Sequence, residues 1–204
     1  MKDLFRKNRY YFLSILLFLI IGGVLLCFSD KETVSLWINR HHSPALDQFF
    51  VSFNIIGDLR FSVITLFFLL LLKDWKWTLK AVFCFAGVML VTQFAKYILF
   101  PDSVRPVIHF EPNVLRLLDD VVQLTTYSFP SGHTSASFAI ATFFALLKSG
   151  RKWNFIFAFL ALFVGYGRIY MSQHFITDVC VGMLIGVFVT TLIWWCYPKF
   201  LETR

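Results

Sequence analysis

Charged residues are scarce in this chain. Asp, Glu, Lys and Arg together make up 15% of its 204 residues, whereas hydrophobic residues make up 58%. The mean hydropathy of +0.69 is well above that expected of a soluble domain. The chain also lacks the alternation of apolar and polar residues that is typical of a transmembrane barrel strand, as the six consecutive apolar residues at 67–72 illustrate. We therefore predict an all-α integral membrane protein.

The sequence has only four cysteines, and no stretch of it is long and polar enough to form a soluble domain. The cysteines lie within or at the ends of apolar runs without the spacing of metal ligands, so we expect them to pack as small apolar residues. The net charge of +7 comes without a basic stripe on a soluble face, which argues against a nucleic-acid partner. We predict a single transmembrane domain over residues 1–204, beginning with a short cytoplasmic segment of about residues 1–10. The four cysteines are Cys27, Cys84, Cys180 and Cys196.

Six uncharged runs predict six membrane-spanning helices. A helix needs about 20 mostly apolar residues to cross the hydrocarbon region, and only the first and last runs approach that length. The other four reach it if polar neighbours enter the helix and face the interior of the bundle or a wet cavity. The alternative that residues 1–28 form a signal peptide is disfavoured because no small-residue cleavage site follows. The six runs cover residues 11–28, 61–72, 81–95, 134–147, 153–167 and 179–198.

The distribution of Lys and Arg predicts the orientation of this six-helix bundle. Basic residues in short loops stay on the cytoplasmic side of a membrane. With the N-terminus inside, twelve of the 19 basic residues lie on the inner side, so both termini are predicted to be cytoplasmic. The inner residues are Lys2, Arg6, Lys7, Arg9, Lys73, Lys76, Lys80, Lys148, Arg151, Lys152, Lys199 and Arg204.

Three polar clusters interrupt the apolar sequence. An ionisable group near lipid is costly and is therefore a candidate for function. In the predicted topology all three clusters lie at the outer ends of helices, so we expect them to form one site at the outer membrane interface. The clusters are Lys96 with Arg105, Pro130-Ser131-Gly132-His133, and Arg168 with His174 and Asp178.

The residue types in these clusters indicate a phosphate-binding site. Lys96, Arg105 and Arg168 supply three positive charges for the oxygens of a phosphate group. Ser131 and Gly132 lie where the fourth helix begins, so free backbone N–H groups and a hydroxyl would contribute further donors. The alternative is that Ser131 is an ordinary helix N-cap after a proline turn.

The two histidines predict acid–base and nucleophilic chemistry. His174 and Asp178 are four residues apart and share a helix face, so the carboxylate would orient the imidazole as a nucleophile or base. His133 would act as a general acid, and the two opposite protonation states imply a bell-shaped pH profile. The alternative is a buried His–Asp pair that only stabilises the bundle. No third ligand is suitably spaced for a metal ion, and we predict no cofactor.

Two long outer connections complete the predicted topology. Residues 29–60 contain Trp37 and an aromatic stretch at 46–51, which suits an interfacial helix. We interpret the adjacent His41 and His42 as solvated rather than metal-binding. Residues 100–129 are rich in charge and would form either a lid that reads a headgroup or a solvated loop.

At the three clusters the sequence resembles the type-2 phosphatidic acid phosphatase family, membrane relatives of vanadium haloperoxidases. That family carries Lys-x6-Arg-Pro, then Pro-Ser-Gly-His, then Ser-Arg-x5-His-x3-Asp, and the resemblance extends from the third to the sixth predicted span. This chain departs from the pattern twice, with eight residues between Lys96 and Arg105 and with Gly167 in place of the Ser. The longer spacing is compatible with the pattern if Asp102 and its neighbours bulge from the loop.

The resemblance implies a role for each matching residue. His174 would attack phosphorus to form a phosphohistidine, Asp178 would orient it, and His133 would protonate the leaving group and then assist water. The phosphoryl oxygens would be bound by Lys96, Arg105, Ser131, Gly132 and Arg168.

An outward-facing site at a membrane interface suits a lipid phosphate or diphosphate. Because the short chain lacks a headgroup-binding domain and resembles compact bacterial members of this family, we expect undecaprenyl diphosphate as the substrate, with the protein in a bacterial inner membrane and the site on the periplasmic side. Lipid A, phosphatidylglycerophosphate and phosphatidic acid are alternative substrates. A lipid-phosphate binding or transport protein without hydrolysis is the alternative outside enzymes, although simple binding does not need an oriented imidazole. The sequence gives no indication of the oligomeric state.

Overall fold

The structure, a computed structural model, describes residues 2–71 and 75–201, and regular secondary structure in this part of the chain is helical throughout. Each of the six predicted apolar runs corresponds to one long helix. The long helices are α2 (Arg9–Phe28), α5 (Leu59–Leu71), α6 (Trp75–Phe94), α8 (Gly132–Leu147), α9 (Phe155–Tyr170) and α10 (Ile176–Leu201). The short ones are α1 (Lys2–Lys7), α3 (Lys31–Arg40), α4 (Pro44–Phe53), α7 (Pro106–His109), the 3₁₀ turns η1 (Asn54–Gly57) and η3 (Lys152–Asn154), and the π-helical turn η2 (Ala95–Leu99).

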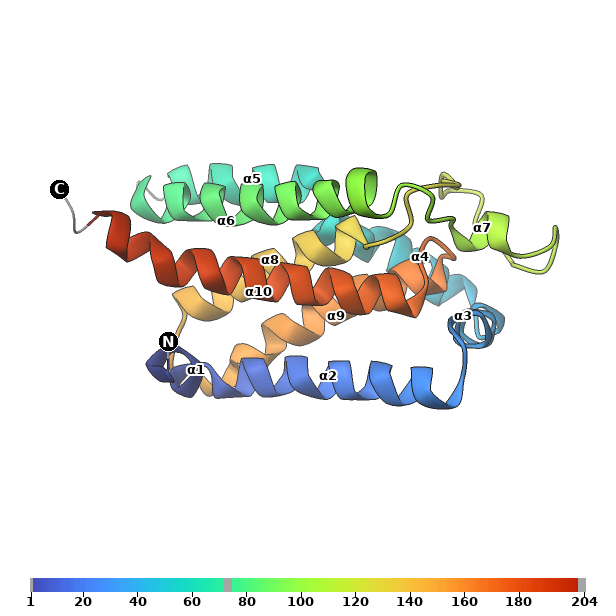
Figure 1. The fold of residues 1–204 in the computed structure, drawn as a ribbon, viewed down its shortest axis with the longest axis horizontal. Helices are drawn as coiled ribbons and strands as arrows, with labels where there is room; N and C mark the ends of the chain where they lie inside the picture. Colours follow the sequence, from blue (N-terminus) through green and yellow to red (C-terminus); the bar gives the residue numbers. More distant parts are fainter. Residues whose placement is uncertain (1, 72–74, 202–204) are drawn as a thin grey trace.

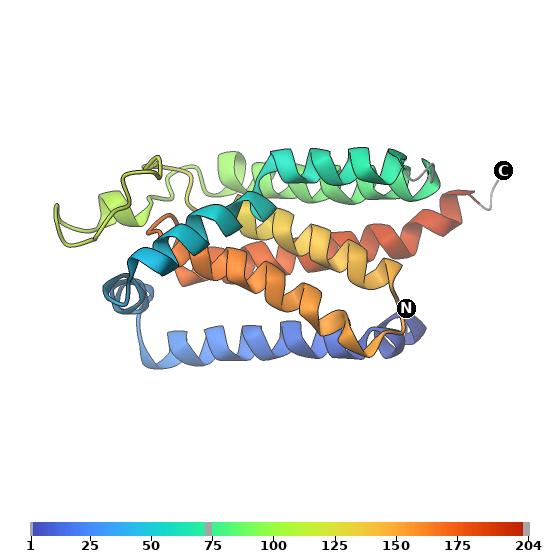
Figure 2. The ribbon, with the colours of Figure 1, turned by 180° about the vertical axis from the view of Figure 1, so that it is seen from behind.

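The long helices form one elongated bundle (Figures 1 and 2). Helix α8 lies in the interior, where it contacts α6, α9 and α10. Helices α5 and α6 lie along one side of the bundle and α2 along the other (Figure 1). The start of α2 and the end of α10 lie at one end, whereas α3, α4 and α7 lie at the opposite end (Figures 1 and 2). The polar connections 29–60 and 100–129 are therefore on the same end of the molecule.

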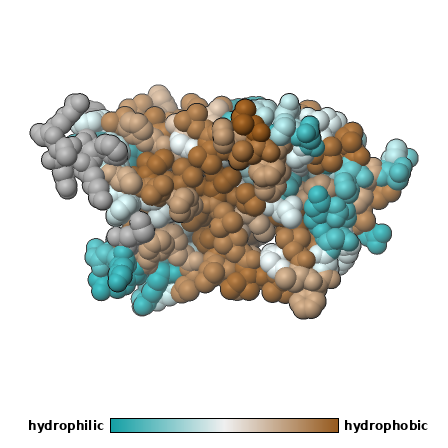
Figure 3. Space-filling view, in the orientation of Figure 1, coloured by the Kyte–Doolittle hydropathy of each residue, from teal (hydrophilic) through white to brown (hydrophobic). Residues whose placement is uncertain are grey.

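The helices have the length and composition of membrane spans. Four segments qualify on their own, namely Arg9–Phe28, Trp75–Leu99, Lys152–Tyr170 and Ile176–Tyr197. Helix α5 joins them if it is counted as one span with Pro44–Gly57, from which it is bent by 56°. Apolar residues cover the middle of the bundle and hydrophilic residues gather at its two ends (Figure 3). These features confirm an integral membrane protein, while the count of six spans and the cytoplasmic termini stay predictions.

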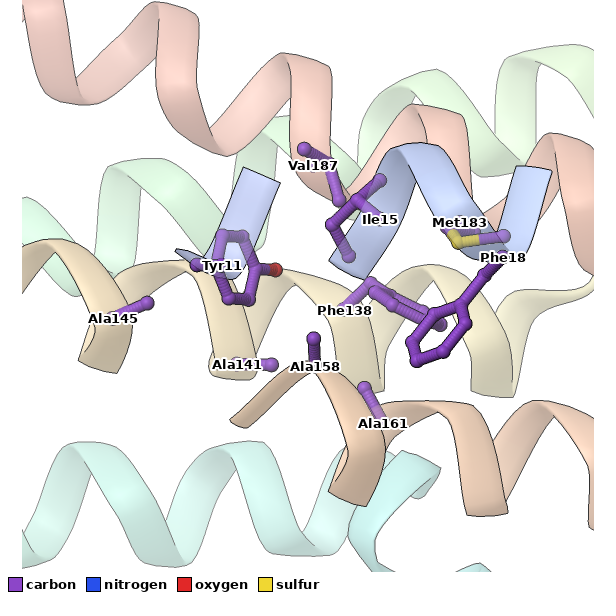
Figure 4. Close-up of a cluster of buried hydrophobic side chains, with 10 residues drawn as sticks. All are labelled: Tyr11, Ile15, Phe18, Phe138, Ala141, Ala145, Ala158, Ala161, Met183 and Val187. Carbon is purple, nitrogen blue, oxygen red and sulfur yellow. The ribbon is translucent and has the colours of Figure 1, made fainter. Parts of the chain in front are cut away.

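Helix α8 is short for a membrane span and is enclosed by other helices of the bundle. It has 16 residues, about 24 Å at 1.5 Å per residue. One face packs in a cluster with Tyr11 of α2, Ala158 of α9 and Met183 of α10 (Figure 4), and Tyr11 Oη lies 2.7 Å from Thr142 Oγ1. The beginning of the helix is also inside the bundle, since Ser131, Thr134 and Ser135 are all buried.

Two glycines bring α10 against the backbone of α8. A Cβ added to Gly182 would lie 2.7 Å from the carbonyl oxygen of Ser131, and one added to Gly186 would lie 2.5 Å from that of Ser135. Glycines four residues apart let membrane helices approach closely, because no side chain separates the backbones. The first turn of α8 is therefore held tightly against α10.

The outer connections are ordered by polar contacts with the bundle. The aromatic stretch at 46–51 falls within α4, where Asp47 accepts hydrogen bonds from Arg116 and, at 2.5 Å, from Tyr170 Oη. His41 Nδ1 lies 2.6 Å from the carbonyl oxygen of Trp37. The Asp47–Arg116 ion pair fastens the connection 100–129 onto α4, so both connections form one polar layer at this end.

Candidate active site

Ser131 is the N-cap of α8. Its Oγ accepts hydrogen bonds from the backbone N–H of Thr134 (3.5 Å) and from Thr134 Oγ1 (2.9 Å), as the capping alternative requires. Because the oxygen is the acceptor in both bonds, the hydroxyl hydrogen can be donated to a ligand. The backbone N–H of Ser131 donates to the carbonyl oxygen of Asp178 (3.0 Å), which joins the start of α8 to the start of α10.

Lys96 lies in the π-helical turn that ends α6. A π-helical turn contains one more residue than an α-helical turn, and a further turn at residues 101–102 follows it. The chain accommodates the longer spacing to Arg105 within these two turns. Lys96 Nζ donates to the carbonyl oxygen of Tyr127 (2.7 Å), and its Cε lies 3.8 Å from the point that a Cβ on Gly132 would occupy. Lys96 therefore reaches the start of α8 despite the added residues.

His174 lies in the buried turn between α9 and α10, where Asp178 orients it. Oδ2 of Asp178 lies 3.3 Å from His174 Nδ1 and accepts hydrogen bonds from Ser128 Oγ (2.5 Å) and the backbone N–H of Phe175 (3.1 Å). A carboxylate that accepts the Nδ1–H leaves the lone pair of the ring on Nε2. Burial lowers the pKa of His174 to about 3, against the opposing effect of the Asp178 hydrogen bond. The ring is thus neutral at pH 7, with Nε2 unprotonated.

Arg105 covers the Nε2 side of His174. Its Nη1 lies 3.4 Å from His174 Nε2 and donates to the carbonyl oxygen of Gln173 (3.0 Å), while its Nε donates to the carbonyl oxygen of Thr126 (3.0 Å). Burial lowers the pKa of Arg105 from its ordinary value, but a guanidinium remains charged in proteins. A fixed positive charge therefore lies beside the lone pair of His174.

The Nε–H of Arg168 is available to a ligand. Nη1 donates to Asn54 Oδ1 (3.0 Å) and Nη2 donates to Gln173 Oε1 (3.2 Å). The Nε–H is buried and has no hydrogen-bond partner among the described residues. Because a buried donor on a charged group is costly to leave unpaired, this N–H is suited to an acceptor that arrives with a ligand.

His133 lies in the first turn of α8, beside an apolar pocket. The pocket has a volume of about 350 Å³ and lies between α5, α6 and α8, with Gly132 and His133 in its wall. The turn η1, which precedes α5, packs closely against the first turn of α8, since a Cβ added to Gly57 would lie 2.7 Å from the carbonyl oxygen of His133. His133 is thus partly exposed next to a space that suits an apolar chain.

The structure brings the three predicted clusters together at one end of the bundle. Lys96 approaches Gly132, the N–H of Ser131 bonds to Asp178, and His174 links Asp178 to Arg105. The connection 100–129 contributes through Arg105, Tyr127 and Ser128, so it is part of the site and not only a solvated loop.

Three further residues of the site were not predicted from the sequence. Ser128 bonds to Asp178, Asn54 bonds to Arg168, and Gln173 bonds to both arginines. No spacing marks Ser128 or Asn54, because the partner of each, Asp178 or Arg168, is distant from it in the sequence. A signal for Gln173 was present, since it is a polar residue in a largely apolar segment directly before His174. Within residues 2–71 and 75–201, no group of three or more His, Cys, Asp or Glu side chains is placed to hold a metal ion.

Comparison with known proteins agrees with the resemblance in the motifs. The model of the PAP2 superfamily matches residues 77–202, more than half of the chain. The chain belongs to the PAP2 superfamily. The prediction of a phosphatase, a hydrolase embedded in the membrane, is confirmed at this level.

Individual relatives of this PAP2 chain match most of its length. The undecaprenyl-diphosphatase of Sulfolobus acidocaldarius is 26% identical over 194 residues, 91% of this chain and 90% of that protein. The lipid A 4'-phosphatase of Bacteroides thetaiotaomicron is 29% identical over 177 residues, 78% of this chain and 74% of that protein. Some curated relatives match over shorter stretches, one over 41% of its own length.

The crystal structure of Aquifex aeolicus LpxE shares the fold. It superposes on this chain with a TM-score of 0.68 at 30% sequence identity, and the match covers 79% of this chain and 93% of that one.

Proposed function

We propose that this PAP2 protein dephosphorylates a membrane lipid phosphate or diphosphate through a phosphohistidine on His174, with undecaprenyl diphosphate as the substrate. The observation that carries the proposal is the orientation of His174, whose Nδ1 faces Asp178 while its Nε2 faces Arg105. A lone pair beside a fixed cation is placed to attack a phosphorus atom whose oxygens bind that cation.

The phosphoryl group would bind among the three basic residues and the start of α8. Arg105 and Arg168 both donate hydrogen bonds to Gln173, the residue before His174. Lys96 approaches Gly132 from the end of α6. The Nε–H of Arg168, the hydroxyl of Ser131 and the free N–H groups of the first helical turn would complete the donors. These donors compensate the negative charge of the transferring group, which is the main requirement of phosphoryl transfer.

In the first step, Nε2 of His174 forms a bond to the terminal phosphorus as the bond from that phosphorus to the oxygen of the leaving group breaks; for undecaprenyl diphosphate this is the oxygen that bridges the two phosphorus atoms. His133 gives its proton to that oxygen, and the lipid leaves. In the second step, His133 accepts a proton from water and the water oxygen bonds to phosphorus as the bond from phosphorus to Nε2 breaks, which releases inorganic phosphate and restores His174. The apolar pocket beside His133 supports this assignment, because the leaving group that His133 protonates carries the lipid chain.

Undecaprenyl diphosphate is favoured by the relative from Sulfolobus acidocaldarius, which matches nearly the whole chain and is named for this activity. Lipid A is the second candidate, favoured by the 4'-phosphatase from Bacteroides thetaiotaomicron. The first candidate would make the leaving group a lipid monophosphate, and the second would make it a sugar hydroxyl.

The test is phosphate release by detergent-purified protein and its His174→Ala variant in the presence of EDTA. The substrates are undecaprenyl diphosphate, lipid A, phosphatidylglycerophosphate and phosphatidic acid. We expect the highest kcat/KM on undecaprenyl diphosphate, and a loss of about 10⁴-fold or more in the variant because the nucleophile is removed.

Each other outcome contradicts a defined part of the proposal. A preference for lipid A changes the substrate and leaves the mechanism intact. Release that survives His174→Ala rejects the phosphohistidine. Inhibition by EDTA that added metal reverses rejects a metal-independent reaction. Folded protein that binds these lipids and hydrolyses none of them is a binding or transport protein.

A further inference from the structure

Gln173 lies between the two arginines of the site. Its side chain is 2% exposed, and Oε1 accepts hydrogen bonds from Arg168 Nη2 (3.2 Å) and from Arg105 Nη1 (3.4 Å). Its backbone carbonyl oxygen accepts a third bond from Arg105 Nη1 (3.0 Å). One residue thus fixes two guanidinium groups that come from different parts of the chain.

The other end of the same amide is bonded to the outer connection. Gln173 Nε2 donates to Gln123 Oε1 (2.5 Å), and Gln123 Nε2 in turn donates to the carbonyl oxygen of Val121 (3.1 Å). The connection 100–129 also carries Arg105 itself. The hydrogen bond between the two side-chain amides therefore forms a bridge that links this connection to the turn containing His174.

A neutral acceptor is suited to this place for an electrostatic reason. Two guanidinium groups that lie close together repel each other, so an oxygen between them is needed to hold both in one geometry. A carboxylate would hold them more firmly, but its negative charge would cancel a positive charge that the phosphate group requires and would repel the phosphate itself. An amide oxygen supplies the hydrogen bonds and leaves the positive charge of the site unchanged.

We propose that Gln173 is a positioning residue that sets Arg105 and Arg168 at the spacing of two phosphoryl oxygens, and that Gln123 fixes Gln173 by holding the opposite end of its amide. This inference rests on the proposed function, because it assigns the two arginines to phosphate binding. Gln173 acts through the arginines, and His174, Asp178 and His133 keep the roles described above.

The test separates the charge of residue 173 from its hydrogen bonds. In Gln173→Glu the size of the side chain is kept and a negative charge is added, so we expect KM to rise at least about 30-fold and inhibition by orthovanadate, a phosphate analogue, to weaken by a similar factor. In Gln173→Met the acceptor is removed, and we expect kcat/KM to fall by about 10- to 100-fold, because each guanidinium loses a charge-assisted bond.

Gln123 provides the second half of the test. Gln123→Leu should lower kcat/KM by a smaller factor, about three- to ten-fold, because Gln173 keeps its bonds to the arginines. In a background of Gln173→Met the same change should have little further effect, since two residues that act through one contact are not additive. Additive losses in the double variant would reject the bridge.

Gln48→Met is the matched control. Gln48 belongs to α4 and lines a separate polar pocket with Asp47, Ser52 and Arg116, so the control should keep the KM and orthovanadate inhibition of the natural protein. A purely structural role for Gln173 would lower kcat through a smaller active fraction and leave KM and the inhibition constant unchanged. That result, or variants of Gln173 within two-fold of the natural protein, would overturn the inference.

A binding measurement keeps this inference separate from the proposed reaction. Orthovanadate should raise the unfolding temperature of the detergent-purified natural protein and of Gln48→Met, and should do so much less for Gln173→Glu. If the protein shows no turnover but this difference is present, the proposed function fails and the positioning of the arginines stands. If turnover depends on His174 while orthovanadate protects every variant equally, only the inference about Gln173 is rejected.

Discussion

His133 and His174 are two imidazoles with opposite tasks in the proposed reaction. His174 is buried, bonded to Asp178 through Nδ1 and covered by Arg105 on its Nε2 side. His133 is partly exposed beside an apolar pocket. Their surroundings agree with the assignment of His174 to phosphorus and His133 to the leaving oxygen, and this difference can be tested at the level of single residues.

His133→Ala should separate substrates by their leaving groups. A lipid alkoxide needs a proton as it leaves, whereas p-nitrophenolate is stable without one, so the loss in kcat should be about 10²- to 10⁴-fold for phosphatidic acid, a lipid monophosphate ester, and much smaller for p-nitrophenyl phosphate. The measurement compares kcat for both substrates in the natural protein and in the variant. Equal losses would remove His133 from the acid role and favour a structural one.

His174 should also make the folded protein sensitive to acid. Its pKa is lowered by burial from 6.5 to about 3 in the folded state, so between these values the unfolded chain binds a proton that the folded protein does not. Stability is therefore complete above about pH 6.5 and falls by up to about 1.4 kcal/mol for each pH unit as the pH drops towards 3.

Thermal unfolding of detergent-purified protein from pH 7 to pH 4 measures this dependence. The unfolding temperature of the natural protein should fall more steeply than that of His174→Gln, which has no titrating group at this position. Identical slopes for the two proteins would show that His174 is not buried as a neutral ring.

At the scale of the elements, the contact between α8 and α10 determines the geometry of the site. Ser131 and Gly132 begin α8, and Asp178 lies in the first turn of α10. Gly182 and Gly186 allow these two helices to touch through their backbones. Because the contact is between backbones, a methyl group on either glycine displaces a helix and not only a side chain.

Gly186→Ala should therefore lower both stability and activity. The new Cβ would meet the carbonyl oxygen of Ser135 at 2.5 Å, and overpacking of this kind costs about 1–3 kcal/mol. Gly23→Ala in α2 is the control, because nothing lies within 4 Å of its added Cβ and alanine is the better helix former. Unfolding temperature and kcat/KM are compared for both variants. A tolerated Gly186→Ala would show that the spacing of α8 and α10 is adjustable.

The positions of the helices could be predicted from the sequence more completely than the site. Uncharged runs locate each long helix, because a span must be apolar and must pair its backbone groups internally. The clusters around His133 and His174 could be found for a related reason, since polar residues in such runs need a function or a partner.

What could not be predicted depends on tertiary contacts. The bond from Ser128 to Asp178 and the bond from Asn54 to Arg168 join segments that are distant in sequence. No periodicity records such contacts. Gln173 was overlooked although it directly precedes His174, because the motif specifies only the first and last residues of that segment.

The whole molecule has two chemically different ends separated by an apolar belt (Figure 3). The end with α3, α4 and α7 carries the site, and the opposite end carries the start of α2 and the connection from α8 to α9 (Figures 1 and 2). Lys148, Arg151 and Lys152 lie in that connection. By the positive-inside rule we propose that this basic end is cytoplasmic and that the site opens on the outer side of a bacterial inner membrane.

This topology requires α8 to cross the membrane, although its 16 residues are fewer than a span normally needs. The two ends of α8 must then lie on opposite sides of the membrane. In a variant without native cysteines, Asp120→Cys and Lys152→Cys place one exposed thiol on each side of α8. A membrane-impermeant maleimide should label Asp120→Cys in intact cells and Lys152→Cys only after the membrane is permeabilised. The reverse pattern would place the site in the cytoplasm. Labelling of both positions in intact cells would mean that α8 does not cross, and the short helix would then enter and leave on the outer side.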